Sequence, residues 1–275
     1  MATEHTYPLE NSEESSRLAN QHEVIKDAMG QLVFAPINLP AAPLRILDSG
    51  TADGTWIRDL KASTAPVGHQ FYGTDINANE FPTDVPPGTT YQAQDITRPW
   101  PKDWEGQFDL VHQRLVLIAA GAQQKEAVQS LGALVKPGGW IQLIEAPYDL
   151  PDGCGPELHA FNEVMKAVFA HMGGDLDLAQ RLPEWLEQDG FVDVQYRDVV
   201  MKSGAQNPNP ELARRSVFSM TTACKGLSQF AKTLPPSKLS LSPEKLDTLS
   251  SDLSEELKTV GGAYLLRIVW ARKVI

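Results

Sequence analysis

The sequence predicts an α/β protein built on a parallel sheet with helices on both faces, and two features support this fold class. From Leu44 onward, short aliphatic runs typical of buried strands alternate with segments of helical periodicity. The first run, 44–47, is followed by Gly50 and Gly54, and a helix resumes at Thr55. Such a turn is a common ligand site, because glycine lets the backbone approach a ligand and the first helical amides are unpaired.

The glycine turn favours a cofactor with a cationic amino-acid end over a dinucleotide. Its spacing from Gly50 is Gly-x-Ala-x-Gly, which differs from the Gly-x-Gly-x-x-Gly that seats a pyrophosphate. Asp48 stands at the end of the strand, where a carboxylate would repel phosphate but accept hydrogen bonds from an ammonium group. S-adenosylmethionine is a cofactor of this kind. Glycines after a buried strand are also ordinary turn residues, so a purely structural interpretation of the turn stays open.

Charge and composition exclude several classes of protein. A net charge of −11 argues against a surface for nucleic acid or an anionic membrane. Cys154 and Cys224 lie far apart without metal-ligand spacing, so we expect reduced thiols and no metal site. No apolar run reaches membrane-spanning length, and the first ten residues are too polar for a signal peptide. We therefore expect a cytoplasmic protein, with a homodimer left open.

The chain is expected to divide into an N-terminal arm and helix over 1–43 and a main domain over 44–275. Asn11 and Glu14 are spaced as in a capping box, and prolines end the predicted helix before the first strand. Further strands are expected at 69–76, 89–96, 108–115, 140–146, 191–200 and 263–273, with a tight turn at 136–139. Cap insertions, mostly helical, are expected at about 150–190 and 201–262.

Polar residues close the predicted strands at the edge of the sheet where ligands of open α/β sheets bind. Asp75 ends the second strand 21 positions after Gly54, close to the spacing of an acidic residue that binds ribose hydroxyls. Asp95 follows the third strand, His112 lies in the exit of the fourth, and Glu145 ends the fifth.

In order and spacing, these segments resemble class I S-adenosylmethionine-dependent methyltransferases. The resemblance is carried by Ile46-Leu-Asp-Ser-Gly-Thr-Ala-Asp-Gly54, Asp75, Asp95-Ile96, Phe108-Asp-Leu-Val-His-Gln-Arg114 and Leu134-Val-Lys-Pro-Gly-Gly-Trp-Ile-Gln-Leu-Ile-Glu145. The segments 15–22 and 35–40 look like a fungal subgroup that includes natural-product methyltransferases and relatives of a regulator of secondary metabolism. Ala52 departs from the family, which usually has glycine there.

The resemblance implies a fold and a cofactor site. The fold would be a Rossmann-like, doubly wound sheet of seven strands, six parallel and the last antiparallel. Asp48, Gly50 and Gly54 would line the methionine end of S-adenosylmethionine, Asp75 the ribose, and Asp95 with Ile96 the adenine. The predicted cofactor site also includes Thr51, Ile76 and His112.

Methyl transfer to a hydroxyl or amine can use a general base, and two residues are candidates. His112 is the first, because it lies beside the expected methyl position and titrates near neutrality. Glu145 is the second. Each has a structural alternative, since His112 also suits the edge of a core and Glu145 also suits a loop anchor.

The predicted substrate site comes from the N-terminal arm and the cap. Its residues are Tyr7, His22, Phe161 and Met165. Apolar side chains at these cap positions suit a hydrophobic small molecule, although they equally suit packing of the cap itself.

Three functions remain open on the sequence. The first is transfer of a methyl group to an oxygen or nitrogen of a small, largely apolar natural product. The second is a regulatory protein of secondary metabolism that keeps the cofactor fold and acts through a partner. The third is a cyclase-type enzyme that binds the cofactor without transferring its methyl group.

Overall fold

The computed structural model describes residues 13–64 and 66–274, which form parts of two compact units. The core unit consists of residues 29–147, 177–199 and 266–274, and the helical unit of residues 13–28, 148–176 and 200–265. The predicted helix start at Asn11 and the predicted substrate residue Tyr7 lie outside the described residues.

A seven-stranded sheet runs in the order β3-β2-β1-β4-β5-β7-β6. Its strands are β1 Arg45–Ser49, β2 Gln70–Asp75, β3 Thr89–Ala93, β4 Phe108–Arg114, β5 Val135–Glu145, β6 Phe191–Ser203 and β7 Gly262–Lys273. The pairs from β3 to β5 are parallel, and β7 pairs antiparallel with β5. The predicted Rossmann-like sheet is thus confirmed. The order reverses direction between β1 and β4, the switch point where open α/β sheets bind ligands.

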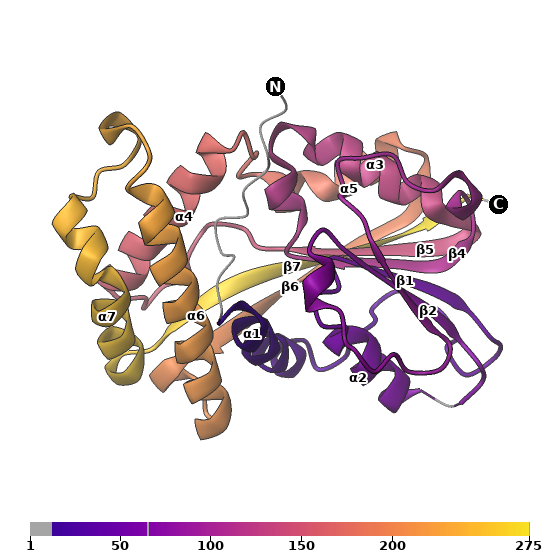
Figure 1. Cartoon of the computed structure of the whole chain (residues 1–275), viewed down its shortest axis with the longest axis horizontal. Helices are drawn as coiled ribbons and strands as arrows, with labels where there is room; N and C mark the ends of the chain where they lie inside the picture. Colours follow the sequence, from indigo (N-terminus) through magenta and orange to yellow (C-terminus); the bar gives the residue numbers. More distant parts are fainter. Residues whose placement is uncertain (1–12, 65, 275) are drawn as a thin grey trace. The chain divides into compact units, whose positions relative to one another are not determined.

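Helices cover both faces of the sheet in the core unit, as the α/β pattern predicts. They are α2 Thr55–Ser63, α3 Gln124–Leu134 and α5 Leu178–Gln188. Figure 1 shows α2 on one side of the sheet and α3 with α5 on the other. Trp56, Ile57 and Leu60 of α2 are buried at helical spacing against apolar residues of β1, β2 and β4. Burial of each such side chain stabilises the fold by roughly 1.5–3 kcal/mol, and this contact places the N-terminus of α2 beside the end of β1.

The helical unit contains α1 Glu14–Met29, α4 Pro156–His171, α6 Pro210–Ala231 and α7 Pro243–Thr259. Figure 1 shows α4, α6 and α7 side by side. They share an apolar core that includes Leu158, Cys224, Leu253 and Tyr264. Within residues 13–64 and 66–274 there are also five short 3-10 segments, at Ala78–Glu80, Lys102–Trp104, Leu117–Gln123, Gly204–Gln206 and Pro236–Lys238.

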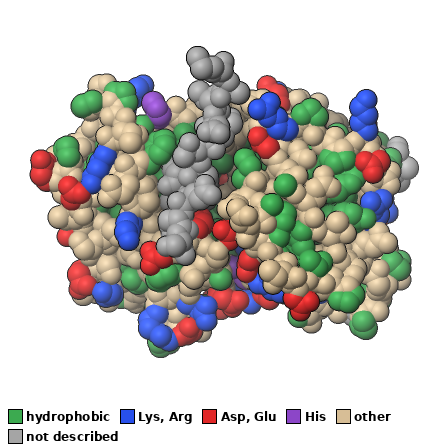
Figure 2. All heavy atoms as spheres, viewed as in Figure 1, with side chains coloured by type: hydrophobic (Ala, Val, Ile, Leu, Met, Phe, Trp, Pro, Cys, Tyr) green, Lys and Arg blue, Asp and Glu red, His purple; other side chains and the backbone are tan. Residues whose placement is uncertain are grey.

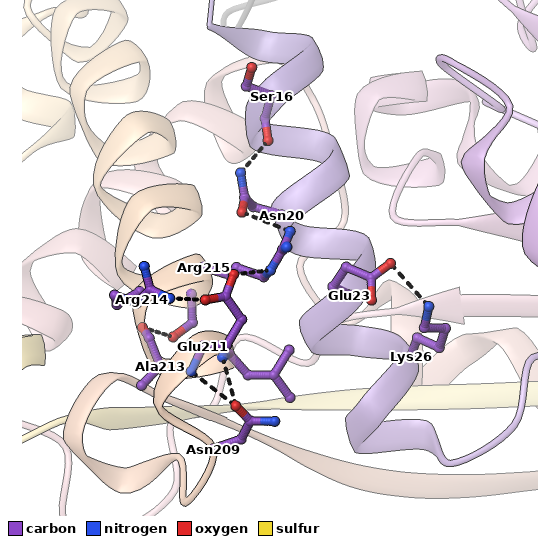
Figure 3. A network of polar contacts seen from close by, with 11 residues as sticks. Ser16, Asn20, Glu23, Lys26, Asn209, Glu211, Ala213, Arg214 and Arg215 are labelled. Carbon is purple, nitrogen blue, oxygen red and sulfur yellow. Dashed lines mark hydrogen bonds and ion pairs between the residues drawn. The ribbon is translucent and has the colours of Figure 1, made fainter.

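Polar contacts join α1 to α6 within the helical unit (Figure 3). Arg215 donates from Nη1 to Asn20 Oδ1 over 3.3 Å and from Nε to Glu211 Oε1 over 2.9 Å. Asn20 in turn donates to the carbonyl oxygen of Ser16 over 2.8 Å. Exposed contacts of this kind contribute little free energy each, so we assign them to the alignment of α1 on α6.

Two strand bounds differ from the prediction. β5 begins at Val135 and so includes the predicted turn at 136–139, because Val135 pairs with Phe108 while Trp140 pairs with Leu110 across an irregularity in the register. Gly138 in this segment has φ of 78°, the left-handed backbone that the predicted turn uses. The predicted third strand ends early, at Ala93, so Asp95 and Ile96 lie in the loop after β3.

The described side chains on the face drawn in Figure 2 intersperse acidic and basic groups over much of the surface. Among the helices of the described residues, none combines the length and apolarity needed to cross a bilayer.

Candidate active site

The turn between β1 and α2 adopts left-handed backbone at three positions. Gly50 and Gly54 have φ of 73°, and Ala52 has φ of 48°. The amides of Gly50 and Thr51 both donate to the carbonyl oxygen of Thr74, over 2.7 and 2.8 Å. The end of β2 therefore fixes the turn, and Ala52 adopts the left-handed conformation at a cost of about 1–2 kcal/mol.

Asp75 binds this turn directly. Its Oδ2 accepts a hydrogen bond from the Ala52 amide over 2.9 Å, and its Oδ1 accepts one from the Asn77 amide over 3.0 Å. Burial raises the pKa of Asp75, the two amide bonds oppose that rise, and the nearby carboxylates of Asp48 and Glu80 add to it. The next side chain, Ile76, is 57% exposed and presents an apolar surface beside the carboxylate.

Asp48 and His112 form a buried pair across β1 and β4. Asp48 Oδ1 lies 2.7 Å from His112 Nδ1, and its Oδ2 accepts a hydrogen bond from the Thr51 hydroxyl over 2.7 Å. The His112 ring stacks on Trp56 with centroids 3.9 Å apart. Burial lowers the pKa of His112, and the hydrogen bond and charge of Asp48 oppose that shift. We therefore assign the ring proton to Nδ1, which leaves Nε2 as an acceptor.

His112 Nε2 is a buried polar atom with no hydrogen-bond partner among residues 13–64 and 66–274. The His112 side chain is 1% exposed, so the ring belongs to the buried packing next to the turn. Trp56 is part of the same packing, although nothing in its sequence context distinguishes it from any other packing residue.

Asp53 is a further carboxylate at the turn, and its role was not predicted from the sequence. Its Oδ1 accepts a hydrogen bond from the Thr55 amide over 3.0 Å, and Arg58 Nη2 lies 2.8 Å from its Oδ2. Burial raises the pKa of Asp53, but the hydrogen bonds from Thr55 and Arg58 outweigh burial and leave it lowered. The Asp-x-Thr spacing at a helix start is a signal that could have found this residue. Because the first amide of α2 already has an anionic partner, this helix start does not suit a phosphate.

Glu145 ends β5 and binds the loop that leaves β4. Its Oε1 accepts hydrogen bonds from the amides of Val116 and Leu117, over 3.0 and 2.8 Å. The side chain is 2% exposed, and burial raises its pKa to about 8 against the opposing effect of the two amides.

The glycines of the turn face side chains of this chain. A Cβ atom added to Gly50 would clash with Val116, and one added to Gly54 would clash with the Tyr91 hydroxyl. Tyr91 lies on β3 and also excludes a side chain at Gly73. The sequence contains no local signal for these contacts, because the partners lie on other strands and loops.

The predicted adenine residues lie next to the end of β2. The amide of Gln94 donates to the carbonyl oxygen of Asp75 over 2.8 Å, which fixes the start of this loop. Asp95 Oδ1 accepts hydrogen bonds from the amide and hydroxyl of Thr97, over 2.8 and 2.7 Å. The core unit therefore brings together most of the predicted cofactor residues.

The predicted substrate residues that are described lie in the helical unit. His22 is 2% exposed on α1. Phe161 is 2% exposed in the apolar core of the unit, and Met165 packs against that core. The substrate-binding roles of these residues stay predictions.

Comparisons with known proteins identify the class. A family model described as a methyltransferase domain matches residues 19–196, and the chain belongs to this family. It is 33% identical to the N-methyltransferase gliN and 36% identical to the methyltransferase psoC of Aspergillus fumigatus, over 98% of each chain. It is also 33% identical to the N-methyltransferase sirN of Leptosphaeria maculans, over 94% of this chain and 92% of that protein. The chain is a class I S-adenosylmethionine-dependent methyltransferase that resembles fungal enzymes.

Solved structures show the same fold at low sequence identity. The phosphoethanolamine N-methyltransferase 2 of Haemonchus contortus, in complex with phosphomonomethylethanolamine and S-adenosylhomocysteine, matches with a TM-score of 0.52 and 16% identity. The match covers 94% of this chain and 52% of that one. A Haloferax volcanii methyltransferase in complex with the Trm112 activator matches with a TM-score of 0.55 and 13% identity, over 96% of this chain and 94% of that one.

Proposed function

We propose that this enzyme transfers a methyl group from S-adenosylmethionine to a nitrogen atom of a small, largely apolar natural product. The observation that carries the proposal is the acidic lining of the glycine turn by Asp48, Asp53 and Asp75. Carboxylates there favour a sulfonium or ammonium group and disfavour phosphate. Nitrogen is preferred over oxygen as the acceptor because gliN and sirN, matched over at least 92% of their length, are N-methyltransferases.

The residues of the turn suit this cofactor. Each oxygen of Asp75 accepts one hydrogen bond from a backbone amide and retains a lone pair for a ribose hydroxyl. Ile76, which is 57% exposed, offers an apolar surface for the adenine ring, and Asp95 follows in the adjacent loop. Both oxygens of Asp48 are engaged by Thr51 and His112, so Asp48 acts on the methionine end through its charge and its remaining lone pairs.

The cofactor supplies an electrophilic methyl group, and the protein contributes orientation and control of a proton. His112 remains the first candidate for the base. The lowered pKa of His112 keeps its ring neutral at neutral pH, and Asp48 directs the free lone pair to Nε2. A proton that left the acceptor nitrogen would therefore be taken up at Nε2.

The setting of the reaction follows from the same proposal. We place the enzyme in the cytoplasm, acting on a free small molecule without a nucleic-acid or membrane partner, and the net charge of −11 supports this. Sedimentation of the purified chain would decide between a monomer and the homodimer that the sequence leaves open.

The test begins with calorimetric binding of S-adenosylhomocysteine and continues with methyl-labelled S-adenosylmethionine and an extract of the host's metabolites. The expected result is a product heavier by one methyl group, with the label on nitrogen by NMR. Label on oxygen would overturn the choice of acceptor. An isomerised product without label would favour the cyclase, and tight binding of a protein partner without turnover would favour the regulator. Absence of cofactor binding at millimolar concentration would overturn the proposal.

A further inference from the structure

The loop that leaves β4, residues 115–117, lies against the glycine turn and is held under backbone strain. Leu115 has φ of 56°, which an L-residue other than glycine adopts at a cost of about 1–2 kcal/mol. The Leu115 amide donates to the carbonyl oxygen of Ile144 over 2.8 Å. The next two amides, of Val116 and Leu117, both donate to Glu145 Oε1. One side-chain oxygen therefore holds two of the three backbone amides of this loop.

The loop places Val116 directly on Gly50. A Cβ atom at Gly50 would clash with Val116 Cγ2 and would approach its Cβ and Cγ1 to 3.3 Å. Gly50 thus faces a branched side chain, although glycine in such a turn is usually attributed to close approach of the ligand. The absence of a side chain at Gly50 is required by a residue 66 positions later in the same chain.

The contacts of Glu145 do not suit a general base. At the pKa of about 8 that burial produces, its carboxyl group is mostly protonated at neutral pH, and a protonated acid cannot accept a proton. In the protonated state, the carbonyl oxygen of the Glu145 carboxyl group can still accept hydrogen bonds from the amides of Val116 and Leu117. The residue that pairs with Glu145 on β7 is Arg267. Its guanidinium donates to both oxygens of Asp198 over 2.7 Å, so the carboxylate partner of Arg267 is Asp198.

We propose that Glu145 is a positioning residue that holds Val116 against Gly50 and thereby maintains the glycine turn in its cofactor-binding conformation. This inference rests on the proposed function, because it assumes that the turn binds the cofactor. Val116 forms the contact, and Glu145 acts only through the loop. Glycine at position 50 is then required by packing against Val116 in addition to its left-handed backbone.

The first experiment separates positioning from base catalysis by replacing Glu145. Glu145→Gln keeps the acceptor oxygen but cannot take up a proton, whereas Glu145→Ala removes the acceptor. We expect Glu145→Gln to retain the affinity for S-adenosylhomocysteine and the kcat within about threefold. We expect Glu145→Ala to weaken binding about tenfold or more, because two buried amides lose their partner. Loss of kcat in Glu145→Gln at unchanged affinity would show a base and overturn the proposal.

Glu256 provides a matched control in the helical unit. Its two carboxylate oxygens accept from the amides of Glu157 and Leu158, both over 2.8 Å. Glu256→Ala therefore removes a comparable pair of hydrogen bonds within the other unit. We expect it to lower stability without changing the affinity for S-adenosylhomocysteine. An equal loss of affinity in both alanine variants would reduce the Glu145 effect to general destabilisation and overturn the proposal.

The second experiment does not depend on whether Glu145→Ala folds. It is a double-mutant cycle of Gly50→Ala and Val116→Ala, read as affinity for S-adenosylhomocysteine. Because Val116→Ala removes the atoms that clash, we expect it to restore part of the affinity lost in Gly50→Ala. Additive losses would mean that Val116 does not impose the need for glycine, which would then come from the ligand or from the left-handed backbone at Gly50, and they would overturn the inference. If the wild-type chain binds S-adenosylhomocysteine and the losses are additive, this inference alone is contradicted. If the wild-type chain does not bind S-adenosylhomocysteine, the proposed function is contradicted.

Discussion

Asp48 on β1 and His112 on β4 are direct neighbours in the register of the parallel sheet, and their side chains meet at 2.7 Å between Oδ1 and Nδ1. The pair is buried, with Trp56 stacked on the imidazole. The Asp48 carboxylate and the His112 imidazole are thus coupled, so the effect of replacing one residue depends on whether the other is present.

The pair predicts a large effect of His112→Ala on stability. The substitution leaves the buried Asp48 carboxylate with the Thr51 hydroxyl as its remaining side-chain hydrogen-bond partner among residues 13–64 and 66–274, so we expect the free energy of unfolding to fall by about 3 kcal/mol. Urea unfolding measures this. In the His112→Ala background, Asp48→Asn should lower the free energy of unfolding by less than it does in the wild type. His159→Ala, at an exposed position, is the control. Independent, additive losses would contradict the coupling. Unchanged turnover and cofactor affinity in a folded His112→Ala protein would remove His112 from the mechanism.

Asp75→Asn tests the assignment of the ribose. We expect binding of S-adenosylhomocysteine to weaken by about one to two orders of magnitude, because a charged hydrogen bond to a hydroxyl is worth about 1.5–3 kcal/mol. Calorimetry should give a similar loss with methylthioadenosine, which keeps the ribose but lacks the amino-acid end. Asp84→Asn, at an exposed position, is the control. If the loss appeared only with the full cofactor, Asp75 would be assigned to the methionine end instead.

Glu145 predicts a specific pH dependence of stability. Its pKa is about 8 in the folded chain and near 4.5 when unfolded. Between these values the folded state binds more protons, so the contribution of Glu145 to stability is complete below about pH 4.5. That contribution falls by up to about 1.4 kcal/mol per pH unit as pH rises toward 8.

The measurement is urea unfolding at several pH values between 5 and 9, for the wild type and Glu145→Gln. The difference between the two curves isolates Glu145 from other titrating groups, including Asp75, whose pKa is also raised by burial. We expect the Gln variant to lose less stability over this range. Parallel curves would contradict a raised pKa for Glu145.

Phe161→Ala decides whether this residue packs the helical unit or contacts a substrate. The side chain is 2% exposed within an apolar core, so we expect the free energy of unfolding to fall by about 3–5 kcal/mol. Val260→Ala, at an exposed valine of the same unit, is the control. Thermal or urea unfolding reports the change. Full stability combined with a raised KM for the substrate would instead identify Phe161 as a substrate contact.

Much of the fold was predictable because local patterns determine it. The alternation of aliphatic runs and helical periodicity predicted the sheet and its covering helices. Elements were harder to delimit where pairing decides them. The segment 136–139, with Gly138 at φ of 78°, falls within the bounds of β5 because Val135 before it pairs with Phe108 and Trp140 after it pairs with Leu110.

The sequence by itself determined the class of site: a glycine turn after a buried strand, with Asp48 and Asp75 at strand ends on one edge of the sheet. Only the tertiary structure decided how these residues are used. It pairs Asp48 with His112, 64 positions away, and places Val116 on Gly50 through the hydrogen bonds of Glu145. The physical reason is that strand-end residues follow from local periodicity, whereas side-chain partners depend on strand order, register and the path of each loop.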